Sequence, residues 1–377
     1  MNYINDVPIV ISKGTPYEIG FSHGTKARDR IKKSLQYNLA TCVRKGSFTL
    51  DDARDMAMQF VKPVQEYQPD YIEEIRGIAE GSDNTFQDIM LLNCRTEIQK
   101  YLAWKDKNKK IKPEFADTES ESCTVIAVTG ERSKNGDTYI AQNWDNRTWA
   151  RECLIFHVIH QDNGRPSIAY IGEAGIISRF GMNSAGIGSG CNSLYSNSPV
   201  DMNGVPLQFL IRGILDSTDL CMAVDACNCG QNAAVNNMLI AYKDGEAADV
   251  EMDYQCAGLL YPENGALTHA NMYVSPGHPR YPYVDTSKAN AFFRHYRTRK
   301  LIQSIDKISS EDIEKVLSDH CNKPQSICRH GEPWLPEEKR AVTVFSYICD
   351  LNDLSMRLAI GCPCGGYQTI YPFSFQQ

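Results

Sequence analysis

The sequence predicts an α+β protein in which antiparallel sheets are covered by helices. Residues 14–104 place apolar side chains at helical spacing, with capping signals, whereas the pattern after Cys123 alternates as strands do and is interrupted by short turns. Few long crossovers separate the predicted strands, which favours antiparallel pairing. The change at Cys123 divides the chain into a helical part, 1–122, and a larger part with sheets, 123–377.

The helical part begins with Thr15-Pro-Tyr-Glu18, a capping box with proline at the first helical position. It predicts a helix that continues to about Leu39. Further helices are expected at about 50–67, 69–79 and 85–104. The charged segment 105–122, which contains Pro113, is typical of a flexible linker that can be cleaved.

The larger part combines predicted strands with helices and hairpins. Strands are expected at 124–129, 137–143, 153–160, 167–172, 176–182 and 186–191. Helices are expected at 205–217, 218–230, 286–304 and 309–320. Hairpins are expected over 239–252, with Asp244-Gly245 as the turn, and between 341–349 and 354–361.

Composition and charge indicate an ordinary globular protein rather than a nucleic-acid or membrane protein. The net charge is −7, and no block rich in lysine and arginine lies beside aromatic residues. No apolar stretch approaches the roughly 18 residues of a membrane span. The first residues have neither a basic nor an apolar signal region, so we expect a cytoplasmic protein.

The fourteen cysteines are too few for a disulfide scaffold in a chain of 377 residues, and we expect them to be reduced. Cys227-Asn-Cys229 and Cys362-Pro-Cys364 are closely spaced pairs, but no histidine pair with zinc spacing accompanies them. The pattern favours buried thiols over a metal site, and a structural zinc protein is a weaker alternative.

Cys123 is the candidate nucleophile. It follows the acidic stretch Glu119-Ser-Glu-Ser122 and opens an apolar, strand-like run. Cleavage before Cys123 gives one residue a thiol and an α-amine, and the amine, with an ordinary pKa of about 7.7–8.0, can serve as the base for the thiol. The alternative is a buried cysteine in a strand, and residues 119–128 taken alone favour that interpretation.

Several short motifs, in order along the chain, extend this hypothesis. They are Gly14-Thr-Pro-Tyr-Glu-Ile-Gly20 with His23-Gly24, Tyr71-Ile-Glu-Glu-Ile-Arg-Gly-Ile-Ala-Glu-Gly81, Leu92-Asn-Cys-Arg-Thr-Glu97, Cys123-Thr124, Gln142-Asn-Trp-Asp145, Glu173-Ala-Gly-Ile-Ile177, Asn183-Ser-Ala-Gly186, Thr268-His-Ala-Asn271 and Ser326-Ile-Cys-Arg329. With them the chain resembles, over nearly its whole length, the acyl-coenzyme A:6-aminopenicillanic acid acyltransferase (isopenicillin N acyltransferase) family of the N-terminal-nucleophile superfamily.

The resemblance implies a four-layer αββα sandwich that is made as an inactive precursor. Self-cleavage between Ser122 and Cys123 would yield an α chain, 1–122, and a catalytic β chain, 123–377, that stay associated. The family usually has glycine before the nucleophile, where this chain has Ser122. Glycine eases the strained backbone of self-attack, so the departure at Ser122 bears on the rate of cleavage but does not forbid it.

The resemblance also assigns roles to individual residues. Asp145 is expected to bind the α-ammonium of Cys123, and Arg329 to pair with Asp145. Asn271 and Asn192 are expected to donate to the oxyanion. The alternatives are turn residues for Asp145 and Asn192, a strand-end residue for Asn271 and a surface residue for Arg329. Gln142 lies where bile-salt-hydrolase relatives carry arginine.

These expectations predict a self-processing thiol enzyme acting on C–N amide bonds. An acyl group would pass from an amide or acyl thioester donor, acyl-CoA included, to Cys123 and then to an amine. No cofactor, nucleic acid or membrane partner is expected. Hydrolysis by water is the first alternative, as in β-alanyl-amine hydrolases, and a non-catalytic ligand-binding protein is a remote one. A papain-like arrangement of Cys123, His269 and Asn271 ranks lower.

Overall fold

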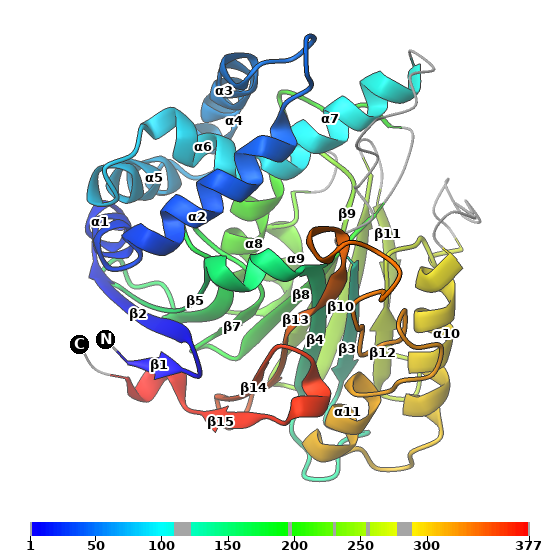
Figure 1. The fold of residues 1–377 in the computed structure, drawn as a ribbon. Coiled ribbons are helices and arrows are strands. Elements are labelled where there is room, and N and C mark those ends of the chain that lie inside the picture. Colours follow the sequence, from blue (N-terminus) through cyan, green and yellow to red (C-terminus); the bar gives the residue numbers. More distant parts are fainter. Residues whose placement is uncertain are drawn as a thin grey trace.

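The computed structural model describes residues 2–108, 122–194, 198–228, 231–253, 257–276 and 289–375. Within these ranges the strands form a nine-stranded and a six-stranded sheet that lie face to face, with helices on both outer sides (Figure 1). This arrangement confirms the predicted four-layer αββα sandwich. No helix in the described ranges is long and apolar enough to cross a membrane.

The larger sheet begins at the N-terminus of the chain. From edge to edge its strands are β1 (Tyr3–Ile4), β2 (Val7–Gly14), β5 (Leu154–Gln161), β6 (Ile168–Glu173), β7 (Gly181–Asn183), β8 (Ile187–Ser193), β9 (Asn236–Tyr242), β10 (Glu246–Met252) and β11 (Ala257–Leu260). Among the described strands of this sheet, only β2 and β5 pair in parallel, and the other pairs are antiparallel as predicted.

The smaller sheet carries the candidate nucleophile on its second strand from one edge. Its strands, in order, are β12 (Ala266–His269), β3 (Ser122–Val128), β4 (Tyr139–Arg147), β13 (Ala341–Asp350), β14 (Ser355–Ile360) and β15 (Gln368–Ile370), all antiparallel. β3 pairs with β4 along its whole length and with β12 only from Val125 to Val128, so at Cys123 one side of the strand has no strand partner.

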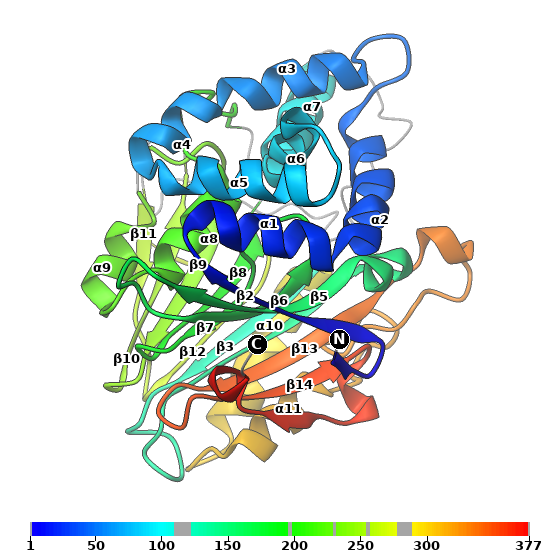
Figure 2. The same cartoon turned by 90° about the vertical axis from the view of Figure 1, so that its left-hand side faces the viewer.

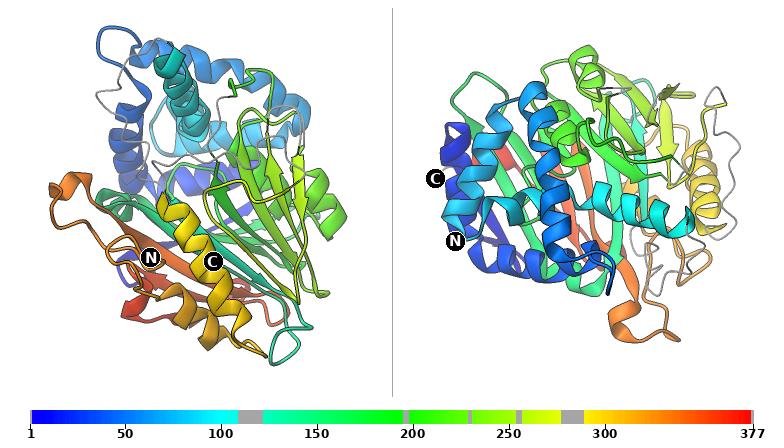
Figure 3. Two further views of the ribbon diagram at one scale, coloured as in Figure 1. Left: turned by 90° about the vertical axis from the view of Figure 1, so that its right-hand side faces the viewer. Right: turned by 90° about the horizontal axis from the view of Figure 1, so that it is seen from above.

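Helices cover the outer face of each sheet (Figures 2 and 3). Over the larger sheet lie α1 (Pro16–Lys26), α2 (Arg28–Leu39), α5 (Asp70–Gly81), α6 (Phe86–Asn93), α8 (Leu207–Leu215) and α9 (Leu220–Asp225). α3 (Leu50–Gln59), α4 (Val61–Tyr67) and α7 (Arg95–Asn108) pack against them as an outer tier. α10 (Ala289–Gln303) and α11 (Ser310–Leu317) cover the smaller sheet.

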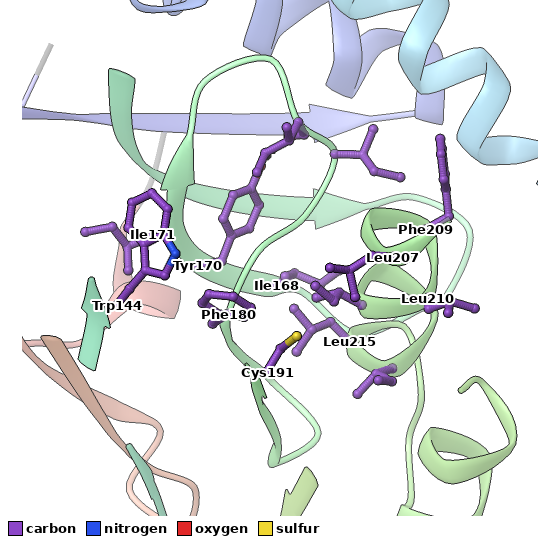
Figure 4. Packing of buried hydrophobic residues seen from close by; sticks show 14 of the residues in the cluster. Trp144, Ile168, Tyr170, Ile171, Phe180, Cys191, Leu207, Phe209, Leu210 and Leu215 are labelled. Atoms are coloured by element: carbon purple, nitrogen blue, oxygen red, sulfur yellow. Dashed lines mark hydrogen bonds between the residues drawn. The ribbon is translucent and has the colours of Figure 1, made fainter. Parts of the chain in front are cut away.

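The main apolar core is continuous from the space between the sheets to the helices over the larger sheet. In Figure 4, Trp144 and Phe180 lie between the sheets, whereas Cys191 lies on the opposite face of the larger sheet, near Leu215 of α8. A second cluster lies between the smaller sheet and α10 and α11, and includes Ile126. Successive β3 side chains therefore enter different cores, as the alternation of a strand requires.

Three helices predicted as continuous are each divided in two. The segment from Thr15 to Leu39 breaks at Ala27, the segment 50–67 at Phe60, and the segment 85–104 at Cys94. The break at Phe60 has a direct cause, because it puts Pro63 in the first turn of α4, where the missing N–H costs nothing.

The predicted helical part also contains strands, since β1 and β2 precede α1 and extend the larger sheet. The predicted strand 176–182 is mostly wrong, because only Gly181–Asn183 pairs. Before it, the Asn93 side chain bonds the Gly175 carbonyl and the Ile177 N–H, and His23 Nε2 accepts from Gly175 N–H. Side chains therefore satisfy backbone groups that a sheet ladder would otherwise bond.

Most of the predicted linker 105–122 lies outside the described residues. Its first residues continue α7 to Asn108, and its last, Ser122, begins β3. The ends of two predicted helices, residues 229–230 and 286–288, also lie outside the described ranges.

Candidate active site

Cys123 is the second residue of β3 and points into the space between the two sheets. Its side chain belongs to the main core together with Val125 and with Trp144 on the adjacent strand β4. Ser122 and Thr124 point to the opposite face, toward α10 and α11. The Cys123 residue is only 4% exposed in the intact chain.

Two side chains hold the backbone of Cys123. Asn271, which follows β12, accepts the Cys123 N–H at its Oδ1 over 2.9 Å. Arg294 of α10 donates from Nη2 to the same Oδ1 over 2.9 Å, and from Nη1 to the Cys123 carbonyl and to Thr124 Oγ1. Arg294 is fully buried, so a fixed positive charge lies beside the bond between Ser122 and Cys123.

Asp145 lies opposite Ser122 in the β3–β4 register, on the face of the sheet that α10 and α11 cover. Its Oδ2 accepts from Ser122 Oγ over 2.7 Å, and its Oδ1 accepts from Thr343 Oγ1 over 2.7 Å. Burial raises the pKa of Asp145, and the charges of Arg294 and Arg329 oppose that rise. In the intact chain Asp145 therefore accepts a hydrogen bond from Ser122, the residue before the candidate nucleophile.

Arg329 is buried rather than a surface residue, but its partner differs from the one predicted. Its Nη2 donates to Glu332 over 2.6 Å, in an ion pair, instead of to Asp145. Its Nη1 donates to Ser122 Oγ over 3.4 Å, so Ser122 links it to Asp145. The prediction missed Glu332, because a glutamate three residues along a loop has no helical or strand geometry to place it.

Asn192 of β8 lies across the space between the sheets, and a charged network fixes its amide. Its Oδ1 accepts from His269 Nδ1 over 3.0 Å, while His269 Nε2 bonds Glu251 over 2.9 Å. Burial opposes a charged imidazole, but Asp249 and Glu251 outweigh it and raise the pKa of His269. Among the described residues, Asn192 Nδ2 is buried and has no hydrogen-bond partner.

The same network excludes the papain-like arrangement. Both ring nitrogens of His269 are occupied, one by Asn192 and one by Glu251. A histidine that serves as general base for a thiol needs one nitrogen directed at that thiol. His269 therefore positions Asn192 and the loop after β12 rather than activating Cys123.

The side-chain amide of Gln142 connects the two sheets. Its Nε2 donates to the Cys191 carbonyl over 3.1 Å and its Oε1 accepts the Cys191 N–H over 3.0 Å. A side-chain amide can both donate and accept in this way, whereas a guanidinium has no acceptor.

Sequence reasoning missed Arg294 and Thr343. Arg294 had one recognisable signal, because α10 buries Ala291, Arg294, Thr298 and Ile302 at helical spacing. An arginine on the buried stripe of a helix needs a partner inside the protein. Thr343 had none, since its role depends on the register between β13 and β4.

A family model for acyl-coenzyme A:6-aminopenicillanic acid acyl-transferase matches residues 132–363, more than half of the chain. The chain belongs to this family. It is also similar to the 40 kDa form of acyl-coenzyme A:6-aminopenicillanic-acid-acyltransferase from Emericella nidulans, with 27% identity over 355 residues, which cover 94% of this chain and 92% of that relative. Family membership makes the protein an enzyme of amide acyl transfer or hydrolysis.

Two solved structures are similar at low identity. Penicillin V acylase from Agrobacterium tumefaciens aligns with 63% of this chain and 83% of its own, with a TM-score of 0.43 and 12% identity. Conjugated bile acid hydrolase from Clostridium perfringens aligns with 66% of this chain and 92% of its own, with the same TM-score and identity.

Proposed function

We propose that the protein is a self-processing cysteine acyltransferase that forms an acyl-Cys123 intermediate and passes the acyl group to an amine. The observation that carries the proposal is the binding of the Cys123 N–H by Asn271 Oδ1, next to the buried Arg294. An ordinary strand cysteine donates its N–H to a neighbouring strand. Here a side chain takes that place, and it can hold the nitrogen equally well as an amide or as an amine.

The contacts at Ser122 support cleavage before Cys123. In the intact chain Ser122 Oγ occupies Asp145 Oδ2. Release of Ser122 would leave that carboxylate oxygen without its donor, near the newly formed α-amine. Asp145 would then hold the amine, which is the role assigned by the resemblance, and Thr343 would keep the carboxylate oriented.

The charge beside the amine favours its work as a base. Arg294 donates to the same oxygen as the Cys123 nitrogen, so the two nitrogens lie close together. The Asp145 carboxylate favours the charged amine, and the positive charge of Arg294 opposes this and so favours the neutral amine, the form that accepts the thiol proton. The thiolate then attacks the carbonyl of the donor, the amine of an amide donor or the thiol of a thioester donor leaves with that proton, and acyl-Cys123 remains.

Asn271 and Asn192 are the proposed oxyanion donors. Asn271 Nδ2 donates to the Ser193 carbonyl over 3.1 Å, and its second hydrogen is available to another acceptor. Asn192 Nδ2 is the buried donor without a partner described above. A donor that is already oriented stabilises charge in the transition state without reorganisation.

A trapping experiment tests the proposal. The purified enzyme is mixed with panels of amides and acyl-CoA thioesters, quenched in acid and analysed by intact mass and peptide mapping. An acyl adduct on Cys123 is expected, which an added amine removes faster than water does. C123A should give no adduct, whereas C221S, which alters an exposed cysteine, should behave as wild type.

Faster loss of the adduct to water than to every amine tested would favour the hydrolase alternative. Turnover without any adduct in wild type, and undiminished in C123A, would contradict the proposal.

A further inference from the structure

Four potential metal ligands converge on the side of the smaller sheet that carries Arg329. His320 follows α11, Cys328 and His330 flank Arg329, and Cys364 lies in the 3₁₀ turn η5 (Pro363–Gly365) after β14. One nitrogen or sulfur atom from each residue lies within 4.8 Å of the corresponding atoms of the other three. None of the four is a residue of the proposed acyl-transfer chemistry.

The three separations measured from His330 Nε2 are close to those of a tetrahedral site. Zn–S distances of about 2.3 Å and Zn–N distances of about 2.0–2.1 Å place two nitrogens about 3.3 Å apart, and a sulfur and a nitrogen about 3.6 Å apart. His330 Nε2 lies 3.0 Å from His320 Nε2, 3.5 Å from Cys328 Sγ and 3.8 Å from Cys364 Sγ. Small shifts would bring all four atoms onto one ion.

Hydrogen bonding alone does not account for this arrangement. Three polar atoms surround His330 Nε2, but a ring nitrogen has one hydrogen or one lone pair in the ring plane and can serve one of them well. A cation at the centre satisfies all four atoms together. Two sulfurs and two imidazole nitrogens in a tetrahedron are the donor set that Zn²⁺ prefers.

A neighbouring thiol provides outer support. Cys362 Sγ lies 3.9 Å from His330 Nδ1, the ring nitrogen that is left to carry the proton, and Cys362 donates to the Arg329 carbonyl over 3.4 Å. Histidines that bind metals through one nitrogen usually bond the other to a second group, which fixes the ring.

We infer that His320, Cys328, His330 and Cys364 bind one Zn²⁺ as a structural site. Four protein ligands leave no open position for substrate, so the metal fastens the fold. It joins the segment after α11 to η5 and holds Arg329 between two of its ligands. The Arg329 N–H donates to Thr343 Oγ1, and the Arg329 carbonyl accepts the Thr343 N–H. Thr343 Oγ1 in turn donates to Asp145. Binding releases the protons of the two thiols.

Metal content of the full-length protein tests this inference. Protein expressed with added zinc and passed through a desalting column should hold about one zinc per chain by elemental mass spectrometry. H320A and C364S alter exposed ligands and should retain roughly a tenth of that or less. C321S alters an exposed cysteine next to His320 that is outside the set, and should retain the full amount.

Two further measurements make the outcome decisive. Co²⁺ in place of zinc should give the intense visible bands of tetrahedral cobalt and a thiolate charge-transfer band, both lost in C364S. C123A should bind zinc like wild type, because the inference is independent of the proposed nucleophile. Metal-free wild type without cobalt bands, zinc retained by both ligand variants, or a Cys328–Cys364 disulfide in place of metal would overturn the inference.

Discussion

Asn271 meets the Cys123 nitrogen through an acceptor, Oδ1, while its proposed catalytic role uses a donor, Nδ2. The two roles separate in N271D, which keeps an oxygen for the nitrogen of Cys123 and loses the donor. We expect N271D to be cleaved and to lose about 10²–10³ in kcat, with KM changed much less, because loss of one oxyanion donor costs about 2.7–4 kcal/mol.

N271A loses both groups, so slower cleavage should accompany its lower kcat. Uncleaved precursor is therefore quantified on denaturing gels before rates are compared. Fully cleaved N271D with wild-type kcat would show that Asn271 only holds the nitrogen and is not an oxyanion donor.

His269 affects the proposed reaction through Asn192. It fixes Oδ1 of Asn192, and this leaves Nδ2 as the free donor. H269Q cannot hold Asn192 and Glu251 together and should lower kcat by about tenfold or more, within the range for misplaced transition-state groups. In an N192A background the same substitution should have little further effect, because its target is already gone.

Steady-state kinetics of the two single variants and the double variant measure this coupling, with thermal unfolding as the check on folding. Equal, additive losses in the two backgrounds would mean that His269 has a structural role alone.

At the scale of the element, α1 and α5 cross at unusually close range over the larger sheet. Each presents two glycines four residues apart: Gly20 and Gly24 on α1, and Gly77 and Gly81 on α5. A Cβ on Gly77 would lie 2.2 Å from the Tyr17 carbonyl oxygen, and one on Gly20 would lie 2.0 Å from the Glu74 carbonyl oxygen. Two of the sequence motifs are therefore packing motifs of this crossing.

G77A should lower the free energy of unfolding by about 1–3 kcal/mol, because the backbones must separate to admit the methyl group. R76A, at an exposed position one residue away on α5, should change it by roughly 0.5 kcal/mol or less. Chemical denaturation of both variants makes the comparison. G77A with wild-type stability would show that the crossing adjusts without cost.

The elements also show what the sequence could and could not predict. Periodicity, the capping box at Thr15 and the turn at Asp244-Gly245 anticipated most helices and hairpins. The strand predicted at 176–182 failed because Asn93 and His23, distant in sequence, bond its backbone. The ligand set of the zinc site was overlooked for the same reason, since loops rather than a spacing motif assemble it.

The candidate site was anticipated in its residues more than in its contacts. Cys123, Asp145, Asn192, Asn271 and Arg329 all lie around the start of β3 or across from it. Arg329 pairs with Glu332, and Arg294 bonds the Cys123 carbonyl. Both contacts form only when loops and α10 pack on the smaller sheet. No local sequence pattern predicts those contacts.

At the scale of the whole molecule, the parts before and after Cys123 share one core. β2 pairs with β5, and two buried ion pairs, Arg212–Glu74 and Arg95–Glu173, join the two parts. Cleaved protein should therefore elute from gel filtration as one species, and separate into fragments of about one third and two thirds of 42.4 kDa only in denaturant. Fragments that elute apart without denaturant would contradict this view of the fold.

Cleavage between Ser122 and Cys123 creates the proposed catalytic amine, and N-terminal sequencing of the purified protein measures this cleavage directly. Active wild type should contain a large fragment that begins Cys123-Thr124-Val125. C123A should remain a single chain, because self-attack needs the thiol. Ser122→Gly, which restores the residue usual in the family, should be cleaved at the same bond and no more slowly. A wild-type enzyme that is fully active as one uncleaved chain would contradict the central claim.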